Sequence, residues 1–411
     1  MLFRSVIQTE EGEGVAGVQV NLNGNPSQAW TTPGTGIYLF SIPVSGYDYT
    51  VTSHLDQDPL NGVSTFDLVL MAKHILGIQL LNSPYKMIAA DVNNSGSITT
   101  LDAIQLRKLI LNIDGNFLNN TSWRFVPKSF VFPDPSNPWF SGFPEIINFN
   151  DLAGVYEDQD FVGIKIGDLN GSVEPNVLAS TPRNSTGEVF YLETRDMALR
   201  GGETAVIDFF APEIGSVSGF QGVLGYDPGA LRIMEMRPGL LEKKNLNLRE
   251  GARGRIAMSW NTVDGEPDRE ATGKFLFRLT VEAKRDLRLS DCLHVGGGLP
   301  QGEAYRADGR ETNLGLRVLS PVATGFELLQ NLPNPVTGET AIPFYIPEAG
   351  PVQLIIRTLD GRPVYQKRGH FEAGQNQFLI DRTELPQGAG VLTYTVIAGK
   401  DAATRKMILG N

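Results

Sequence analysis

The chain has 411 residues, too many for one ordinary hydrophobic core, and 41% of them are hydrophobic, as in globular rather than disordered proteins. The formal net charge of −11 argues against a nucleic-acid partner, because phosphate binding needs a basic surface. The single cysteine, Cys292, excludes an intrachain disulfide and a cysteine-based zinc site, and no apolar run is long enough for a transmembrane segment.

Residues 1–53 have the alternating pattern of a small β-sandwich, with strands expected at 15–22, 37–40 and 47–51. A GxGxxG motif at residues 12–17 precedes a strand rather than a helix, which favours a turn over a phosphate site. The segment resembles carboxypeptidase-regulatory-like and adhesin B-type Ig-like repeats, which implies a prealbumin-like spacer domain. The chain begins inside this pattern without a signal-peptide segment, as if a longer N-terminal part were missing, so we interpret it as a fragment, a mispredicted start or one piece of a larger gene product.

A duplicated twelve-residue pattern follows within residues 54–115. Residues 56–67 align with residues 91–102, and an amphipathic helix is expected after each copy. Calcium takes six to eight oxygen ligands from loops in which alternate positions supply oxygens, a glycine makes the sharp turn and a carboxylate follows at position 12. The spacing therefore predicts two calcium loops.

The second loop fits this pattern better than the first. In the second loop Gly96 stands at the turn, and the candidate ligands are Asp91, Asn93, Ser95, Ser97 and Asp102. In the first loop Leu60 offers no side-chain oxygen, and the glycine comes one residue late. Its candidate ligands are Asp56, Asp58, Asn61 and Asp67. Turn chemistry is the alternative for any single Asp, but it does not explain a duplicated pattern followed by helices.

The two loops and their helices resemble a type I dockerin domain over residues 54–115. The resemblance implies calcium as cofactor and a cohesin-like domain as partner, bound through loop positions 10 and 11 and through basic residues of the helices. The matching residues are Thr65, Phe66, Lys73, Thr100, Leu101 and Lys108. Phe66 and Leu101 depart from the family's usual Ser/Thr pair, and helix-core packing is the alternative for them.

Residues 116–173 resemble an extension found with such modules, in which Asp168 and Asn170 are either ligands of a partial third loop or turn residues. Residues 174–187 are polar and are expected to form a linker. Strand patterns recur through residues 188–320, which favours a β-sandwich. Its segments 219–231 and 256–260 resemble a cohesin-like or carbohydrate-binding-like domain. The cohesin-like partner would then lie on this chain or on another protein, and Trp260 would either stack on a sugar or lie in the core.

Residues 326–411 resemble the type A C-terminal sorting domain of the type IX secretion system. The matching segments are 332–335, 338–340, 346–350, 359–364, 374–376, 385–388 and 406–409. Two extra residues, 389 and 390, depart from the pattern. The resemblance implies a β-sandwich, the type IX secretion machinery as partner and a secreted or outer-membrane-surface location in a Bacteroidetes-type host.

No catalytic motif emerges, because the four histidines are scattered and the GxSxG-like segment 215–219 has Val217 at its centre. We therefore expect a non-enzymatic, multi-domain and mainly β protein. It would comprise an Ig-like or prealbumin-like sandwich, a helical calcium module, a cohesin-like sandwich and a C-terminal sandwich. The expected function is a calcium-binding adhesion or scaffolding module that works through dockerin–cohesin type interaction. The alternative is an accessory carbohydrate-binding component of an extracellular polysaccharide-degrading system.

Overall fold

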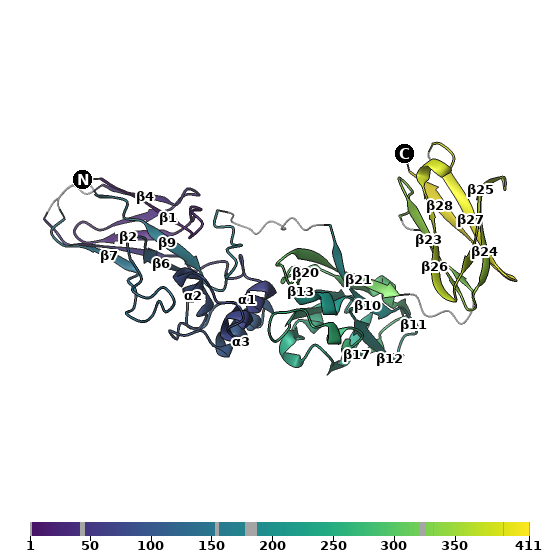
Figure 1. Ribbon diagram of the computed structural model, residues 1–411, viewed down its shortest axis with the longest axis horizontal. Coiled ribbons are helices and arrows are strands. Elements are labelled where there is room, and N and C mark those ends of the chain that lie inside the picture. The colour runs from purple at the N-terminus through teal and green to yellow at the C-terminus, as the bar shows by residue number, and fades with distance from the viewer. Residues whose placement is uncertain are drawn as a thin grey trace. The chain divides into compact units, whose positions relative to one another are not determined.

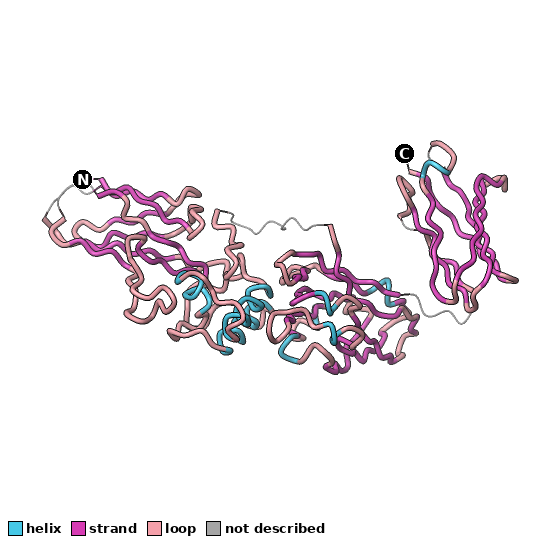
Figure 2. The backbone as a smooth tube through the Cα atoms, viewed as in Figure 1, coloured by secondary structure: helices cyan, strands magenta, loops and turns pink. Residues whose placement is uncertain are grey.

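Figure 1 shows the computed structural model, which describes residues 2–41, 46–152, 156–176, 187–319, 326–331, 333–388 and 390–410. The chain divides into two compact units, Met1–Val318 and Leu319–Asn411. Both consist mainly of strands, and α1, α2 and α3 gather between residues 65 and 110 (Figure 2). This confirms the expected mainly β, multi-domain fold class. Most of the expected linker, residues 177–186, lies outside the described residues.

The first sandwich, which we call the N-terminal sandwich, combines strands from both sides of the helices. One sheet has the order β4 (Ile37–Ser41), β1 (Leu2–Gln8), β9 (Phe161–Lys165) and β6 (Trp123–Pro127), with β8 (Tyr156–Glu157) also paired to β1. The other has the order β3 (Gln28–Thr31), β2 (Gln19–Asn23), β5 (Tyr49–His54) and β7 (Ile146–Phe149). Strands β1 and β9 run parallel, with Ile7 opposite Phe161. The segments expected as separate domains at 1–53 and 116–173 therefore share one core.

The helical module is inserted between β5 and β6. It contains α1 (Thr65–Ile75), α2 (Pro84–Ala90) and α3 (Thr100–Ile110). The two longer helices begin three residues before the expected starts because Ser64 and Thr99 cap them, each in a capping box with the Asp three residues later. Helix α2 was not expected, although Ser83 followed by Pro84 is a helix-start signal.

The middle sandwich is formed by one ten-stranded sheet that encloses its own core. Its strands run in the order β14 (Leu231–Pro238), β17 (Phe275–Ala283), β12 (Thr204–Phe210), β10 (Val189–Arg195), β21 (Glu311–Leu319), β20 (Glu303–Arg306), β13 (Val217–Tyr226), β16 (Arg255–Asn261) and β15 (Leu246–Asn247), and β19 (Leu293–Val295) also pairs with β13. Trp260 is 6% exposed and packs beside Phe220 in this core. The core role considered for Trp260 is therefore the one that the structure shows.

Short elements complete the middle sandwich. They are β11 (Ala198–Leu199) paired with β18 (Leu287–Arg288), α4 (Leu289–Cys292), and the 3-10 turns η1 (Ile214–Ser216), η2 (Lys243–Asn245), η3 (Gly251–Arg253) and η4 (Arg269–Ala271). Cys292 is buried, and burial raises the pKa of its thiol to about 11. The thiol is therefore protonated and unreactive at neutral pH.

The C-terminal sandwich packs two antiparallel sheets around its own core. One has the order β22 (Glu327–Leu328), β23 (Thr340–Ile346) and β26 (Gly374–Ile380). The other has the order β25 (Pro363–Phe371), β24 (Gly350–Thr358), β27 (Gly390–Ala398) and β28 (Asp401–Leu409), and η5 (Arg382–Glu384) is a 3-10 turn. Leu332, which belongs to the sorting-domain resemblance, and Ala389, one of the two extra residues, lie outside the described residues. No helix in the described ranges is both long and apolar enough to span a membrane.

We predict that Tyr394→Phe lowers the free energy of unfolding of the C-terminal sandwich by about 1–2 kcal/mol. The hydroxyl of the fully buried Tyr394 donates to the Leu329 carbonyl at 2.8 Å and accepts from the Asn331 amide at 2.9 Å. Its loss removes one partner from a partly buried carbonyl and one from a buried amide. Calorimetric unfolding measures the change. Tyr365→Phe, which removes only a long contact with Glu384 near the surface, is the control and should stay within about 0.5 kcal/mol of wild type. Equal losses in the two variants would contradict the prediction.

Candidate functional site

The second loop turns two carboxylates inward. Asp91 and Asp102 are both completely buried. Asp91 accepts hydrogen bonds from the amides of Ser95 and Gly96, each at 2.8 Å, and Asp102 accepts from the amide of Asn93 at 3.1 Å. Gly96 has φ +79°, a left-handed conformation that favours glycine at the turn. The backbone thus draws the first and last residues of the loop toward a common centre.

This donor set fits calcium. The Asn93 Oδ1 atom is buried and accepts no hydrogen bond from the described residues. Burial raises the pKa of Asp91, and the charge of Asp102 adds to the effect. The Ser95 hydroxyl lies 3.2 Å from both the carbonyl and the hydroxyl oxygen of Ser97. A hard cation would satisfy the orphaned amide oxygen and neutralise the two carboxylates, and its ligands would be Asp91, Asn93, Ser95, Ser97 and Asp102.

The described residues contain no cluster of three or more His, Cys, Asp or Glu side chains that could hold a metal ion. Loop two provides two carboxylates, and its other candidate oxygens are neutral. Calcium accepts such amide, hydroxyl and carbonyl oxygens, whereas zinc requires nitrogen, sulfur or several carboxylates.

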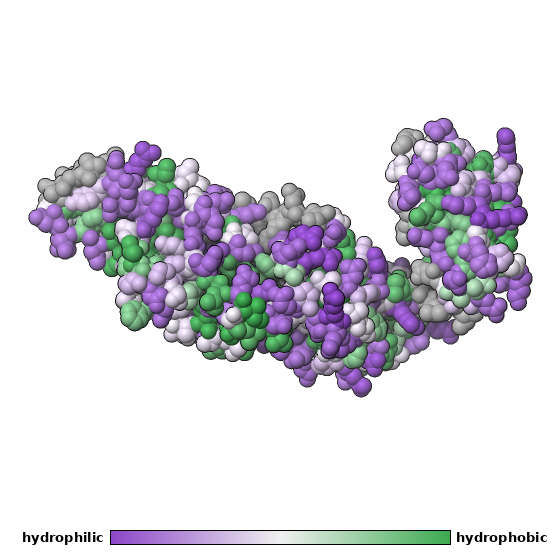
Figure 3. Space-filling view, viewed as in Figure 1, coloured by the Kyte–Doolittle hydropathy of each residue, from purple (hydrophilic) through white to green (hydrophobic). Residues whose placement is uncertain are grey.

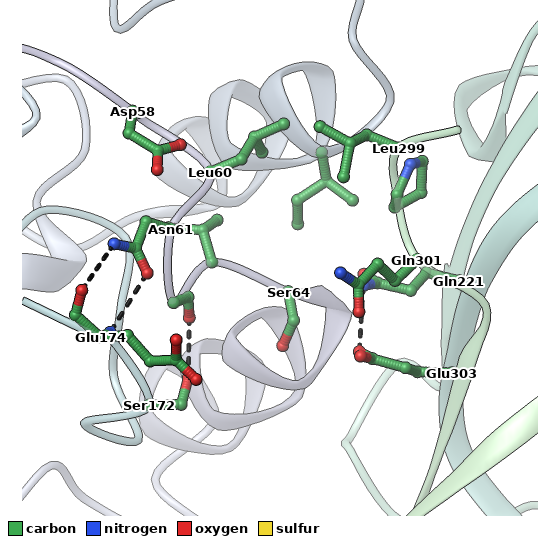
Figure 4. Close-up of a pocket in the computed structure, with 14 residues that line it drawn as sticks. Asp58, Leu60, Asn61, Ser64, Ser172, Glu174, Gln221, Leu299, Gln301 and Glu303 are labelled. Carbon is green, nitrogen blue, oxygen red and sulfur yellow. Dashed lines mark hydrogen bonds between the residues drawn. The ribbon is translucent and has the colours of Figure 1, made fainter. Parts of the chain in front are cut away.

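The first loop is closed by protein contacts instead. Asp56 accepts from the Ser122 amide at 2.9 Å, and the Asn61 side-chain amide exchanges two hydrogen bonds with the backbone of Glu174 at 3.0 and 3.1 Å (Figure 4). Asp67 accepts from the Ser64 amide and, through its other oxygen, from the Leu169 amide, both at 2.8 Å. Three of the predicted ligands of this loop, Asp56, Asn61 and Asp67, therefore bind other parts of the same unit, whereas Asp58 is exposed.

Residues 168–173 form a turn that packs against the first loop. The Asp168 carboxylate accepts hydrogen bonds from the amides of Gly171, Ser172 and Val173, and Asn170 also accepts from Ser172. A side chain at Gly62 would come within 2.7 Å of Val173, so the glycine allows this close approach. Of the two roles expected for Asp168 and Asn170, calcium ligand or turn residue, these contacts are those of turn residues.

The N-terminus of α1 is bound by the middle sandwich. The Thr65 amide donates to the Gln221 side-chain oxygen at 2.7 Å, and the Thr65 hydroxyl lies 2.7 Å from the Ser259 hydroxyl. All three residues are buried. Beside them the Phe66 ring stacks on Tyr305, with ring centroids 5.5 Å apart. Ser64, Gln221 and Glu303 line a cavity of about 70 Å³, and Gln221 donates to Glu303 at 3.3 Å (Figure 4).

Two further contacts extend this interface along the helices. Lys73 is only 7% exposed, and its ammonium lies 2.9 Å from Glu266. Arg107 of α3 donates to the side-chain oxygen of Asn261, and burial lowers the pKa of its guanidinium while Glu242 raises it. At the end of α3 the Leu111 carbonyl accepts from Asn247 at 2.8 Å.

The residues of α3 that are equivalent to Thr65, Phe66 and Lys73 do not contact the middle sandwich. Thr100, Leu101 and Lys108 are exposed, and Leu101 reaches 52% exposure beside the equally exposed Ile104. Figure 3 shows apolar side chains gathered over this region of the helices. The structure thus brings Thr65, Phe66 and Lys73 to the middle sandwich and leaves their counterparts on the surface.

Several interface residues were not among the sequence predictions. Arg107 lies on α3 and Leu111 directly follows it, and neither belongs to the family pattern. Gln221 and Ser259 are polar residues on strands, and their only sequence signal is that they interrupt apolar runs. Nothing in the local sequence distinguishes them from polar residues that face solvent.

Comparison with known proteins identifies one family. Residues 61–111 match the dockerin type I domain. No curated protein matches the chain. A type I cohesin–dockerin complex from Clostridium thermocellum is similar at 14% identity over 34% of this chain and 100% of that chain, with a TM-score of 0.25. The type II cohesin dyad of the ScaA scaffoldin from Acetivibrio cellulolyticus is similar at 10% identity over 52% and 89%, also with a TM-score of 0.25.

The major pilin subunit BcpA of Bacillus cereus covers 99% of this chain and 95% of its own, at 8% identity and a TM-score of 0.20. Such TM-scores are too low to define a fold, which rests here on the strand pairing described above. The family match covers the second loop, α1, α2, α3 and part of the first loop. Over residues 61–111, the chain is similar to dockerin type I domains.

Proposed function

We propose that the helical module and the middle sandwich form a dockerin–cohesin type pair within one chain, and that the pair is a calcium-stabilised unit for adhesion or scaffolding. The observation that carries this proposal is the burial of Thr65 between Gln221 and Ser259, with two hydrogen bonds. Loop positions 10 and 11 of the first loop supply the contact, as the dockerin resemblance implies. A non-catalytic role is part of the proposal.

The energetics favour a specific contact at this point. Thr65 is the first residue of α1, so its amide has no partner within the helix, and Gln221 satisfies it. Phe66 adds an aromatic anchor against the fully buried Tyr305. The Lys73–Glu266 ion pair contributes at most about 1 kcal/mol, because Glu266 is half exposed. Most of the specificity therefore comes from Thr65 and Phe66.

The exposed residues Thr100, Leu101 and Lys108 are proposed as a second contact surface, for a cohesin-like domain of another protein. They repeat the Thr65, Phe66 and Lys73 positions on α3, and the apolar surface around Leu101 and Ile104 supports a role in binding. The chain would then use α1 to bind its own middle sandwich and the exposed residues of α3 to bind a second protein.

Delivery to the cell surface by the type IX secretion machinery is proposed from the resemblance of residues 326–411 to a sorting domain. The alternative function, an accessory carbohydrate-binding component of a polysaccharide-degrading system, is less favoured. Trp260, the residue considered for sugar stacking, is buried in the core of the middle sandwich.

We predict that Thr65→Asp separates the two parts of the pair. A protease recognition sequence placed within residues 177–186 allows the full chain to be cut between the helical module and the middle sandwich. After cleavage, the wild-type halves should elute together in size-exclusion chromatography. Thr65→Asp places a charge among buried groups and should weaken the association by about 2 kcal/mol or more, roughly thirty-fold.

The matched control is Thr100→Asp, at the equivalent and exposed position of α3. Its halves should co-elute as those of wild type do. Wild-type halves that separate on cleavage, or a Thr100→Asp variant that weakens association as much as Thr65→Asp, would refute the internal pair.

We predict that calcium raises the unfolding temperature of the Met1–Val318 unit. Because the folded loop binds the ion and the unfolded chain does not, free calcium at 100 times its dissociation constant adds about 2.7 kcal/mol to the free energy of unfolding. Asp91→Asn should abolish the increase, whereas Asp114→Asn, outside both loops, should keep it. Scanning calorimetry with calcium and with EGTA measures the difference. An unfolding temperature that EGTA leaves unchanged would exclude the calcium site.

A further inference from the structure

A buried lysine lies at the first loop. Lys165, at the end of β9, is only 4% exposed although its side chain ends in an ammonium group. The ammonium donates to the Pro59 carbonyl, inside the first loop, at 2.8 Å and to the Ile166 carbonyl at 3.3 Å. It also lies 5.6 Å from the centre of the Phe117 ring. A cation of the protein itself thus binds the backbone of this loop at Pro59.

The charges around Lys165 are those expected around a cation. Burial lowers the pKa of Lys165 to about 8, and the negative charges of four Asp residues act against that shift. In decreasing order of effect they are Asp168, Asp58, Asp67 and Asp56. Three of the four belong to the first loop. The same carboxylates were predicted from the sequence to ligate calcium.

The other oxygens of the first loop do not suit calcium. Calcium needs six to eight oxygen ligands, whereas an ammonium group has three hydrogen-bond donors. Leu60 provides no side-chain oxygen, and both polar atoms of the Asn61 amide are engaged by the Glu174 backbone. The few oxygens that this loop offers suit an ammonium group, which needs fewer oxygen partners than calcium does.

We propose that the Lys165 ammonium takes the place of the calcium ion in the first loop, so that this loop and α1 fold without metal. In place of the predicted calcium ion, Lys165 neutralises Asp56, Asp58 and Asp67, while Asn61 binds the Glu174 backbone. The number of calcium ions that follows, one per chain, also rests on the site proposed in loop two. The local sequence of the loop does not predict the contact with Lys165, because this residue lies about a hundred residues downstream.

The first test counts calcium ions on the full-length chain by isothermal titration after removal of metal with EGTA. We expect one ion on wild type, one on Asp58→Asn and none on Asp91→Asn. Two ions on wild type, with Asp58→Asn losing one of them, would overturn the proposal. A wild-type chain that takes up no calcium would overturn the site in loop two instead, and the melting test below would still decide the role of Lys165.

The second test measures the unfolding temperature in EGTA, where calcium plays no part. Lys165→Met leaves two buried carboxylates, Asp67 and Asp168, without the nearby cation. The Met1–Val318 transition should therefore fall by about 5 °C or more, an order-of-magnitude expectation for the loss of a buried charge partner. Lys128→Met is the control, because that lysine is half exposed and its ion pair with Asp160 is long, at 3.7 Å. Its loss should shift the transition by less than about 2 °C.

A Lys165→Met transition within about 2 °C of wild type in EGTA would overturn the proposal. If Lys165→Met fails to fold, Asp58→Asn serves as the second variant. This variant removes one of the carboxylates that Lys165 neutralises. It should bind as many calcium ions as wild type, and EGTA should change its unfolding temperature no more than that of wild type. A loss of bound calcium in Asp58→Asn would contradict the lysine's role.

Discussion

Two buried carboxylates, Asp67 and Asp102, hold each loop to the helix that follows it. One oxygen of each accepts the amide of the helix cap, Ser64 or Thr99. The other oxygen of Asp67 accepts the Leu169 amide from outside the first loop, and that of Asp102 accepts the Asn93 amide from within the second loop. A buried carboxylate that loses such partners is costly, so the loop, the start of the helix and the packed segment are fixed together. For α1 this constraint sets the position of Thr65 and Phe66, and hence the contact with the middle sandwich.

The two loops share a sequence pattern and differ in how their negative charge is balanced. In our proposals the first loop carries its own cation, Lys165, while the second takes calcium from solution. The contact with the middle sandwich is made by α1, next to the loop with the internal cation. The exposed face of α3 follows the loop that needs the ion. Calcium would then govern the outward-facing contact surface more than the internal one.

The burial pattern of strand β13 reflects the contact between the helical module and the middle sandwich. An ordinary sandwich strand buries every second residue, yet all ten residues of Val217–Tyr226 are buried. One face of the strand packs on the core through Phe220 and Leu224. The other face carries Gln221, which binds Thr65 of α1, and Val223, which packs against Leu111. The helical module thus covers a face that would otherwise meet solvent.

The sequence alone determined the parts that depend on neighbours along the chain. The alternation of apolar residues predicted strands, the duplicated Asp pattern predicted two loops with helices, and the second loop matched a calcium site because all its ligands lie within twelve residues. Even the early helix starts could have been read from Ser64 and Thr99, since a capping box is a local signal.

Only the tertiary structure decided which of two similar segments does what. Thr65 and Thr100 have equivalent surroundings in sequence, yet one is buried against Ser259 and the other is exposed. Strand β9 returns after the helices to pair with β1, and this pairing carries Lys165 to the first loop. Contacts between residues a hundred positions apart depend on chain topology and long-range packing, for which no local pattern of residues provides a signal.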